Sequence, residues 1–544
     1  MLGDPGLYFY YFDLYTDFRR IVRGADNCGV VSWQEGESWQ ITVYEPDFQT
    51  PECIKGKVFY QIFPDRFCEG IENKPMPFPD RLYQADKHAE PFWQPNETGG
   101  HLNEDYFGGD LEGIRIKLPY LREMGVDYLY LNPIFEAHSN HRYNTADYLN
   151  VDPLLGTNED FEALCTAAKK YGIGIVLDGV FSHTGSDSRY FNREGRYGEG
   201  GAYRDPNSPY RCWYDFGPQY KDGYRSWWGF ETLPEVDEET PSYVEFITGP
   251  GGVIDTWLRR GAAGFRLDVA DELPDEFIEK VRAAVKRVSP EKFLLGEVWE
   301  DATTKFGFNK RRTYLLGKGL DSVMNYPFKN AVLDFVKGKP AEQAMTEILT
   351  ICEHYPAPAM DTALNFLSTH DTERALTVIA DEPANGRGRA WQSGRCVTGD
   401  AYEEGLLRLR MAYAIIYTLP GVPCLYYGDE IAMQGYRDPF NRAFFRWDAH
   451  EQRLRPVLAQ LAQLRHTCEA FRTGQLRVLR AEDGILHYQR VGKVETAEII
   501  VNRTEHIIVE TLASGKSTEV NPMGFTIVVE EVGHNPNHSY YDYV

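Results

Sequence analysis

The stretch Gly264-Phe265-Arg266-Leu267-Asp268-Val269-Ala270 is an apolar run interrupted only by one arginine and one aspartate. A strand that is buried on both faces reads as a nearly continuous run of hydrophobic residues, and a charge within it is costly unless it is paired. Side chains two residues apart on a strand point the same way, so Arg266 and Asp268 are expected to lie side by side. Such an arginine favours the ionised form of the carboxyl group, which suits a nucleophile, although an isolated pair of this kind is more often structural.

Three other apolar stretches also carry carboxylates at their ends, and two of them carry a histidine as well. They are Asp178-Gly179-Val180-Phe181-Ser182-His183, Gly296-Glu297-Val298-Trp299 and Ser368-Thr369-His370-Asp371. Strand and helix patterns alternate from Val58 to Glu430 with eight expected strands, which is typical of an α/β protein with a parallel barrel. A barrel of this kind collects its active-site residues at the C-terminal ends of its strands, so the four endings are predicted to meet there.

In order and in spacing, these four stretches resemble the four signature regions of the α-amylase family of glycoside hydrolases. The segment Gln61-Ile62-Phe63-Pro64-Asp65-Arg66-Phe67 resembles the end of that family's first barrel strand. The Glu297-Val298-Trp299 ending and the β-rich N-terminus are similar to the branch of neopullulanases, cyclomaltodextrinases and maltogenic amylases. The resemblance implies a (β/α)8 TIM barrel that carries additional β-domains.

The resemblance also divides the chain into domains. Residues 1–55, with alternating stretches at 7–12 and 39–44, are expected to form a partial N-terminal β-sandwich. Residues 56–455 form the barrel, and an insertion at about 184–240, too long for an ordinary loop, corresponds to the family's domain B after the third strand. Residues 456–544 read as a C-terminal β-sandwich and tail.

The implied activity is that of a retaining α-glucan hydrolase. The substrates implied are maltooligosaccharides, cyclodextrins, pullulan or starch, cleaved at α-1,4 bonds, with cleavage at α-1,6 bonds left open. Two alternatives remain: a plain α-amylase or glucan-transferring relative, and a catalytically inactive carbohydrate-binding homologue. The presence of Asp268, Glu297 and Asp371 argues against the inactive homologue.

The resemblance assigns the reaction to three carboxyl groups. Asp268 is the expected nucleophile, which forms a covalent glycosyl-enzyme. Glu297 is the expected general acid and base, held protonated by an apolar setting next to Val298 and Trp299. Asp371 matches the third carboxylate, which holds sugar hydroxyls and favours the distorted ring.

Six further residues match substrate-binding positions of the family. Each histidine by itself would more often be a satisfied core residue, but within these motifs the functional role is favoured. The resemblance implies that His183 and His370 stabilise the transition state and that Tyr143 stacks under the sugar at subsite −1. It also implies that Arg266 supports the nucleophile and that Asp438 and Arg442 hold the sugar at subsite −2.

No metal and no cofactor are expected. Many α-amylases bind a structural calcium through an asparagine and a histidine at positions that Ser182 and Asp271 occupy here. The loop at 68–73 also lacks the Asn/Asp-Gly-Asp cluster that holds calcium in some relatives, since it offers few hard oxygen ligands.

The composition restricts the partners. The net charge of −24, from 57 Lys and Arg against 81 Asp and Glu, disfavours nucleic acid and suits an uncharged α-glucan or oligosaccharide substrate. No stretch reads as a membrane span, and the start of the chain does not read as a secretory leader. The nine cysteines lack framework spacing and are expected to be free thiols, which favours a cytoplasmic protein. Because residues 1–55 cover less than half of the branch's dimerising N-terminal module, a monomer or weak dimer is expected.

Overall fold

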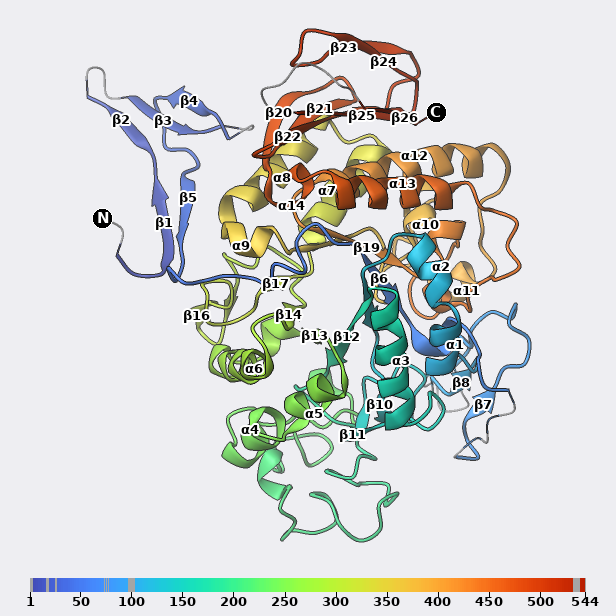
Figure 1. Ribbon diagram of the computed structural model, residues 1–544. Helices are drawn as coiled ribbons and strands as arrows, with labels where there is room; N and C mark the ends of the chain where they lie inside the picture. The colour runs from blue at the N-terminus through green and yellow to red at the C-terminus, as the bar shows by residue number, and fades with distance from the viewer. Residues whose placement is uncertain are drawn as a thin grey trace.

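The computed structural model describes residues 3–15, 19–24, 27–72, 74, 76, 78–95 and 103–531, and the backbone of 539–543. Its centre is an eight-stranded parallel sheet whose strand order is β17-β14-β13-β12-β9-β6-β19-β18 (Figure 1). A further parallel bridge between Met324 and Leu364 joins the two ends of this order and closes the barrel. The predicted (β/α)8 TIM barrel is therefore confirmed. Its strands are β6 (Phe59–Ile62), β9 (Tyr128–Leu131), β12 (Gly174–Gly179), β13 (Gly264–Leu267), β14 (Phe293–Gly296), β17 (Ser322–Val323), β18 (Leu364–Phe366) and β19 (Val422–Tyr426).

Helices connect most of the barrel strands and cover the outside of the sheet (Figure 1). The exception is the connection from β14 to β17, which carries a short hairpin, β15 (Phe306–Gly307) and β16 (Lys310–Arg311), in place of a helix. The helices are α1 (Leu111–Ile116), α2 (Leu118–Glu123), α3 (Asn158–Lys170), α4 (Pro241–Thr248), α5 (Val253–Arg260), α6 (Asp275–Val288), α7 (Tyr326–Lys337), α8 (Ala341–His354), α9 (Ala357–Met360), α10 (Ala375–Ala380), α11 (Arg389–Gln392), α12 (Gly399–Thr418), α13 (Leu454–Thr467) and α14 (Ala470–Thr473).

The barrel interior is filled by side chains that alternate with the outward-facing ones along each strand. The buried cluster includes Phe59, Val176, Phe293, Leu364 and Val422, from five different strands. Burial on both faces explains why these strands read as continuous hydrophobic runs in the sequence. The charged residues at the strand ends lie above this apolar layer, where the loops begin.

Two sheets precede the barrel and lie to one side of it (Figure 1). One pairs β1 (Gly6–Tyr10) with β5 (Trp39–Val43), and the other joins β2 (Phe12–Leu14), β3 (Arg19–Arg23) and β4 (Gly29–Ser32). The ribbon β1–β5 is fastened to α8, because the Gln40 amide donates to Glu353 (2.7 Å) and the Thr42 hydroxyl donates to the His354 carbonyl (2.6 Å). One face of the ribbon is thus covered by the chain's own barrel.

The C-terminal region is an antiparallel sheet with the strand order β20-β21-β22-β25-β26, next to a separate hairpin β23–β24. Its strands are β20 (Gln475–Glu482), β21 (Ile485–Val491), β22 (Glu495–Asn502), β23 (Ile508–Thr511), β24 (Ser517–Val520), β25 (Gly524–Glu531) and β26 (Ser539–Tyr543). Buried Arg490 donates to the Thr418 carbonyl at the end of α12 (2.8 Å), which ties the sheet to the barrel.

Residues 180–240, between β12 and α4, form no α-helix and no strand. They contain isolated β-bridges and the 3-10 turns η2 (Arg211–Trp213) and η3 (Trp227–Gly229).

The domain limits 1–55, 56–455 and 456–544 stay predictions. Of the predicted tail, 532–538 and 544 lie outside the described residues, as does Asn73. Within the described ranges, no helix combines the length and the apolar character that crossing a bilayer requires.

Candidate active site

The register of three neighbouring strands brings the predicted carboxylates together. Asp178 on β12 lies directly opposite Arg266 on β13, and Leu267 on β13 lies opposite Gly296 on β14. The next residues along β13 and β14 are Asp268 and Glu297, so the two leave the barrel as neighbours. Glycine at 296 leaves room for the Leu320 side chain, since a Cβ there would lie 2.3 Å from it.

The Arg266 guanidinium is the centre of the site and is completely buried. Its Nη1 donates to Asp178 (2.7 Å) and to Asp268 (2.8 Å), and its Nη2 lies 2.8 Å from Glu297 Oε2. One guanidinium therefore holds three carboxyl groups, a geometry that the single ammonium of lysine could not reproduce. Asp178 is held from the other side by the hydroxyls of Tyr130 and Tyr143 (2.8 Å each).

Val269 turns the chain sharply after Asp268. Its φ of 39° and ψ of 49° are left-handed, which is uncommon for a β-branched residue and costs about 1–3 kcal/mol. The turn aims the Val269 amide at Glu297 Oε2 (2.9 Å), while the Trp299 indole donates to Oε1 (3.0 Å). Glu297 thus lies among polar donors, and the apolar setting expected from Val298 and Trp299 is wrong in this respect. The backbone strain serves to position this carboxyl group.

His370 is oriented by a chain of hydrogen bonds. The Gln61 amide donates to Nδ1 (3.0 Å), so the neutral ring carries its proton on Nε2, which faces Tyr143 Oη (2.6 Å) and Asp371 Oδ2 (3.1 Å). The rings of Tyr143 and His370 stack with centroids 5.3 Å apart. Burial lowers the pKa of His370 well below its ordinary value, and Arg442 and Arg266 add to this effect. The ring is therefore an uncharged donor at neutral pH.

The predicted pair Asp438 and Arg442 is in contact (3.0 Å), and Arg442 also lies 3.5 Å from Asp371 Oδ1. The Arg442 Nε donates to the His370 carbonyl (2.9 Å), which places the pair on the same side as Asp371. These residues come together at the ends of β18 and β19.

His183 presents an unsatisfied nitrogen. Its Nδ1 contacts the Ser182 hydroxyl (2.9 Å), its ring stacks on Trp227 at 5.1 Å, and its Nε2 is buried without a hydrogen-bond partner. Burial lowers the pKa of His183 to about 4, so the ring is neutral at pH 7. A buried polar atom without a partner is costly, so Nε2 is available to a ligand hydroxyl.

The carboxyl groups retain protons more strongly than isolated ones. Burial raises the pKa of Asp268 well above its ordinary value, the nearby carboxyls of Glu297, Asp178 and Asp371 add to this, and Arg266 opposes it. Burial, followed by the charge of Glu297, raises the pKa of Asp371 to about 7. Arg266 opposes the rise at Asp268 in the direction expected from the sequence, but its guanidinium is shared among three carboxyl groups.

The positions that hold calcium in many α-amylases are engaged with other groups. Ser182 contacts His183, and Asp271 is ion-paired with Lys305 (3.1 Å). The sequence reasoning missed Lys74, whose buried ammonium lies 2.6 Å from Asp110 and donates to the carbonyls of Gly108 (2.5 Å) and Leu154 (3.1 Å). The ammonium therefore lies in a cage of oxygen atoms from these three residues.

Elsewhere in the described part of the chain, one cluster of side chains is of the types that bind metal ions. It consists of Asp80, Glu104 and His138, whose ligand atoms lie within 4.8 Å of one another. Asp80 is already paired with His138 (2.9 Å) and lies 3.6 Å from Arg196. This group is not part of the predicted catalytic set.

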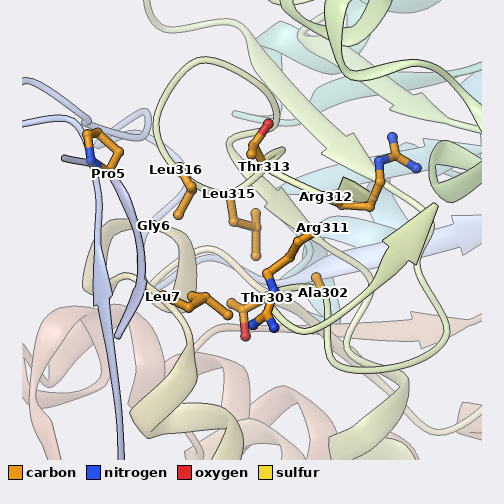
Figure 2. A pocket seen from close by; sticks show the side chains of 10 residues that line it. All are labelled: Pro5, Gly6, Leu7, Ala302, Thr303, Arg311, Arg312, Thr313, Leu315 and Leu316. Atoms are coloured by element: carbon orange, nitrogen blue, oxygen red, sulfur yellow. The ribbon is translucent and has the colours of Figure 1, made fainter. Parts of the chain in front are cut away.

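A cavity of about 160 Å³ lies where the first strand meets the loop after β14 (Figure 2). Leu7, Leu315 and Leu316 give it an apolar lining, and Arg311 lies at its wall. None of the predicted catalytic residues lines it, so it belongs to the joint between the N-terminal ribbon and the barrel.

Residues 61–474 match the family model of the α-amylase catalytic domain. The chain belongs to the α-amylase family of glycoside hydrolases. It is 34% identical over 542 residues to an amylopullulanase of Thermoanaerobacter thermohydrosulfuricus, covering 89% of this chain and 35% of that protein. It is 32% identical over 487 residues to a cyclomaltodextrinase of Geobacillus thermopakistaniensis, covering 84% and 70% respectively. The chain thus spans about a third of the amylopullulanase.

Among solved structures, the ligand-free cyclic α-maltosyl-(1→6)-maltose hydrolase of Arthrobacter globiformis is similar, with a TM-score of 0.75 and 27% identity. The alignment covers 89% of this chain and all of that one (100%). The resemblance to the cyclomaltodextrinase branch is confirmed, whereas relatives named amylopullulanase were not expected from the sequence.

Proposed function

We propose that this chain hydrolyses α-glucosidic bonds of maltooligosaccharides, cyclodextrins, pullulan or starch with retention of configuration. The observation that carries the proposal is the bridging of Asp268 and Glu297 by two nitrogens of one buried guanidinium. This arrangement is compatible with the short carboxyl separation, roughly 5–5.5 Å, that retaining glycosidases use. The names of the relatives support the substrate class.

The first step transfers the glycosyl unit to Asp268. The ionised carboxylate attacks the anomeric carbon, the bond to the leaving oxygen breaks, and Glu297 gives its proton to that oxygen. In the second step Glu297 takes a proton from water, and the resulting oxygen nucleophile breaks the ester to Asp268. After the first step Asp268 is esterified and Glu297 is ionised, and the second step restores the ionised Asp268 and the protonated Glu297.

The remaining residues bind and orient the sugar. The Tyr143 ring, which stacks with that of His370, is assigned to the position under the sugar at subsite −1, and the free Nε2 of His183 is suited to a sugar hydroxyl. Asp371, held by His370 and Arg442, accepts hydrogen bonds from sugar hydroxyls. These hydrogen bonds strengthen as positive charge develops at the anomeric carbon. Asp438 and Arg442 extend the polar surface away from the reacting bond.

The test follows the first products of maltohexaose by proton NMR, with product analysis on starch, pullulan and β-cyclodextrin side by side. Initial appearance of the α-anomer is expected. Initial release of the β-anomer would refute retention, and products from none of the four substrates would refute the activity.

No calcium or other cofactor is part of the proposal. The support is that Ser182 and Asp271 are engaged elsewhere, and that the Lys74 ammonium already supplies positive charge to Asp110. A divalent ion added to this cage would meet the ammonium directly.

We infer a cytoplasmic monomer or weakly associated dimer. The cysteines from Cys53 to Cys468 are all thiols, which suits a reducing compartment. The fastening of the N-terminal ribbon to α8 covers a surface that a partner could otherwise use. A cleft not closed by a second subunit would accept longer chains.

A further inference from the structure

The tip of the inserted segment carries three aromatic side chains next to the active site. Trp227 is partly buried, but Trp228 is 77% and Phe230 is 57% exposed. The ring centroids of Trp227 lie 6.0 Å from Trp228 and 6.2 Å from Phe230. Trp227 also stacks on His183, so these rings continue from the catalytic centre outward to solvent.

Trp228 is held in an unfavourable conformation. Its φ of 52° and ψ of 21° are left-handed, and a bulky residue in this region costs about 1–3 kcal/mol. The strain places a large ring in water, where it gains nothing from burial. An exposed ring kept at a cost to folding indicates a surface for a ligand.

Glu272 fixes the orientation of the tip. Its carboxylate accepts the indole N–H of Trp227 (2.6 Å) and that of Trp228 (2.9 Å). The Glu272 amide donates to the Val269 carbonyl (2.8 Å), and the Val269 amide holds Glu297. Glu297 protonates the leaving group in the proposed mechanism, and this chain of contacts links the tip to Glu297. The tip is therefore assigned to the leaving-group side of the scissile bond.

We propose that Trp228 and Phe230, positioned by Trp227 and Glu272, form a glucosyl-binding subsite for the leaving part of an α-glucan chain. This inference rests on the proposed function for its orientation. The apolar faces of glucose rings suit stacking on exposed aromatic faces, while Glu272 keeps the rings from turning away. The subsite would favour long chains over short ones, because only long chains reach it.

The test measures binding of maltohexaose and maltotriose by calorimetry in the Asp268→Asn background, where substrate is not consumed. Trp228→Gly removes the ring and relieves the left-handed strain. We expect its Kd for maltohexaose to rise about tenfold, the loss for one large aromatic contact, with a smaller change for maltotriose. The thermal midpoint should stay constant or rise. Trp228→Phe should restore most of the affinity, and Glu272→Gln should weaken it, since one amide oxygen replaces two carboxylate oxygens.

Trp33→Ala is the matched control, because Trp33 is also an exposed tryptophan (72%) but lies next to β4. Its Kd should equal that of the parent. An unchanged maltohexaose affinity in Trp228→Gly would overturn the subsite. A parallel loss of affinity and thermal midpoint would instead assign Trp228 a structural role and overturn it equally. If affinity depends on Trp228 but the wild-type chain cleaves no glucan, the subsite stands and the proposed activity falls.

Discussion

Glu238 makes the stability of this protein depend on pH in a direction opposite to that of most carboxylates. Only 7% of the residue is exposed, at the end of the inserted segment. Burial raises the pKa of Glu238 to about 8, compared with an ordinary value of 4.5. Between these values the folded protein keeps a proton that the unfolded chain has released. The contribution of Glu238 is therefore most favourable below pH 4.5 and is lost as pH rises through about 8.

The size of the effect follows from the linkage relation. Each pH unit between the two pKa values costs about 1.4 kcal/mol, so the 3.5 units from 4.5 to about 8 amount to at most about 5 kcal/mol. Glu238→Gln keeps the shape of the side chain and cannot lose a proton. Its thermal midpoint should equal that of the wild type near pH 4.5 and exceed it by several degrees at pH 8.

Calorimetric scans from pH 4.5 to 9 provide the assay. Glu239→Gln is the matched control, because the neighbouring Glu239 is exposed, and its curve should run parallel to that of the wild type. If the Glu238→Gln curve is parallel as well, the buried carboxyl does not hold its proton and the reasoning is refuted.

Three further predictions concern the site and the assembly. Asp268→Asn should lower hydrolysis by at least about a thousandfold while leaving the thermal midpoint within a few degrees, and substantial residual turnover would contradict its role as nucleophile. EDTA should change neither activity nor thermal midpoint, and a large loss with EDTA that calcium restores would contradict the metal-free proposal. Lys74→Met should destabilise the fold by about 3 kcal/mol, because it leaves Asp110 without its counter-ion. Light scattering at micromolar concentration should show a monomer or weak dimer, and the ratio of the rate on starch to the rate on β-cyclodextrin should be high. A tight dimer that strongly prefers β-cyclodextrin would contradict this.

The barrel and the catalytic carboxyls could be predicted because they depend on short segments with strong patterns. The alternation that puts Arg266 beside Asp268 is local, and the parallel register then brings Asp178 opposite Arg266. What the sequence did not reveal depends on contacts between distant segments. The oxygen cage around Lys74 is made by residues more than thirty positions away, and nothing in the sequence around Val269 indicates its left-handed backbone.

Two expectations about the carboxyl groups of the site rest on the same simplification. Both treated a carboxyl group together with its sequence neighbours, Asp268 with Arg266 and Glu297 with Val298. In the folded protein, Asp178, Asp268, Glu297 and Asp371 surround Arg266 and Arg442, and the histidines at the site are neutral. With Asp438, which also pairs with Arg442, five carboxylates face two guanidiniums, and full ionisation would leave three negative charges uncompensated, which is costly in a largely buried space. The cluster therefore retains a proton at neutral pH, and a glycosidase that works through one acid and one nucleophile requires such a shared proton. Binding an uncharged glucan then needs no change in net charge, only a choice of which carboxyl group carries the proton.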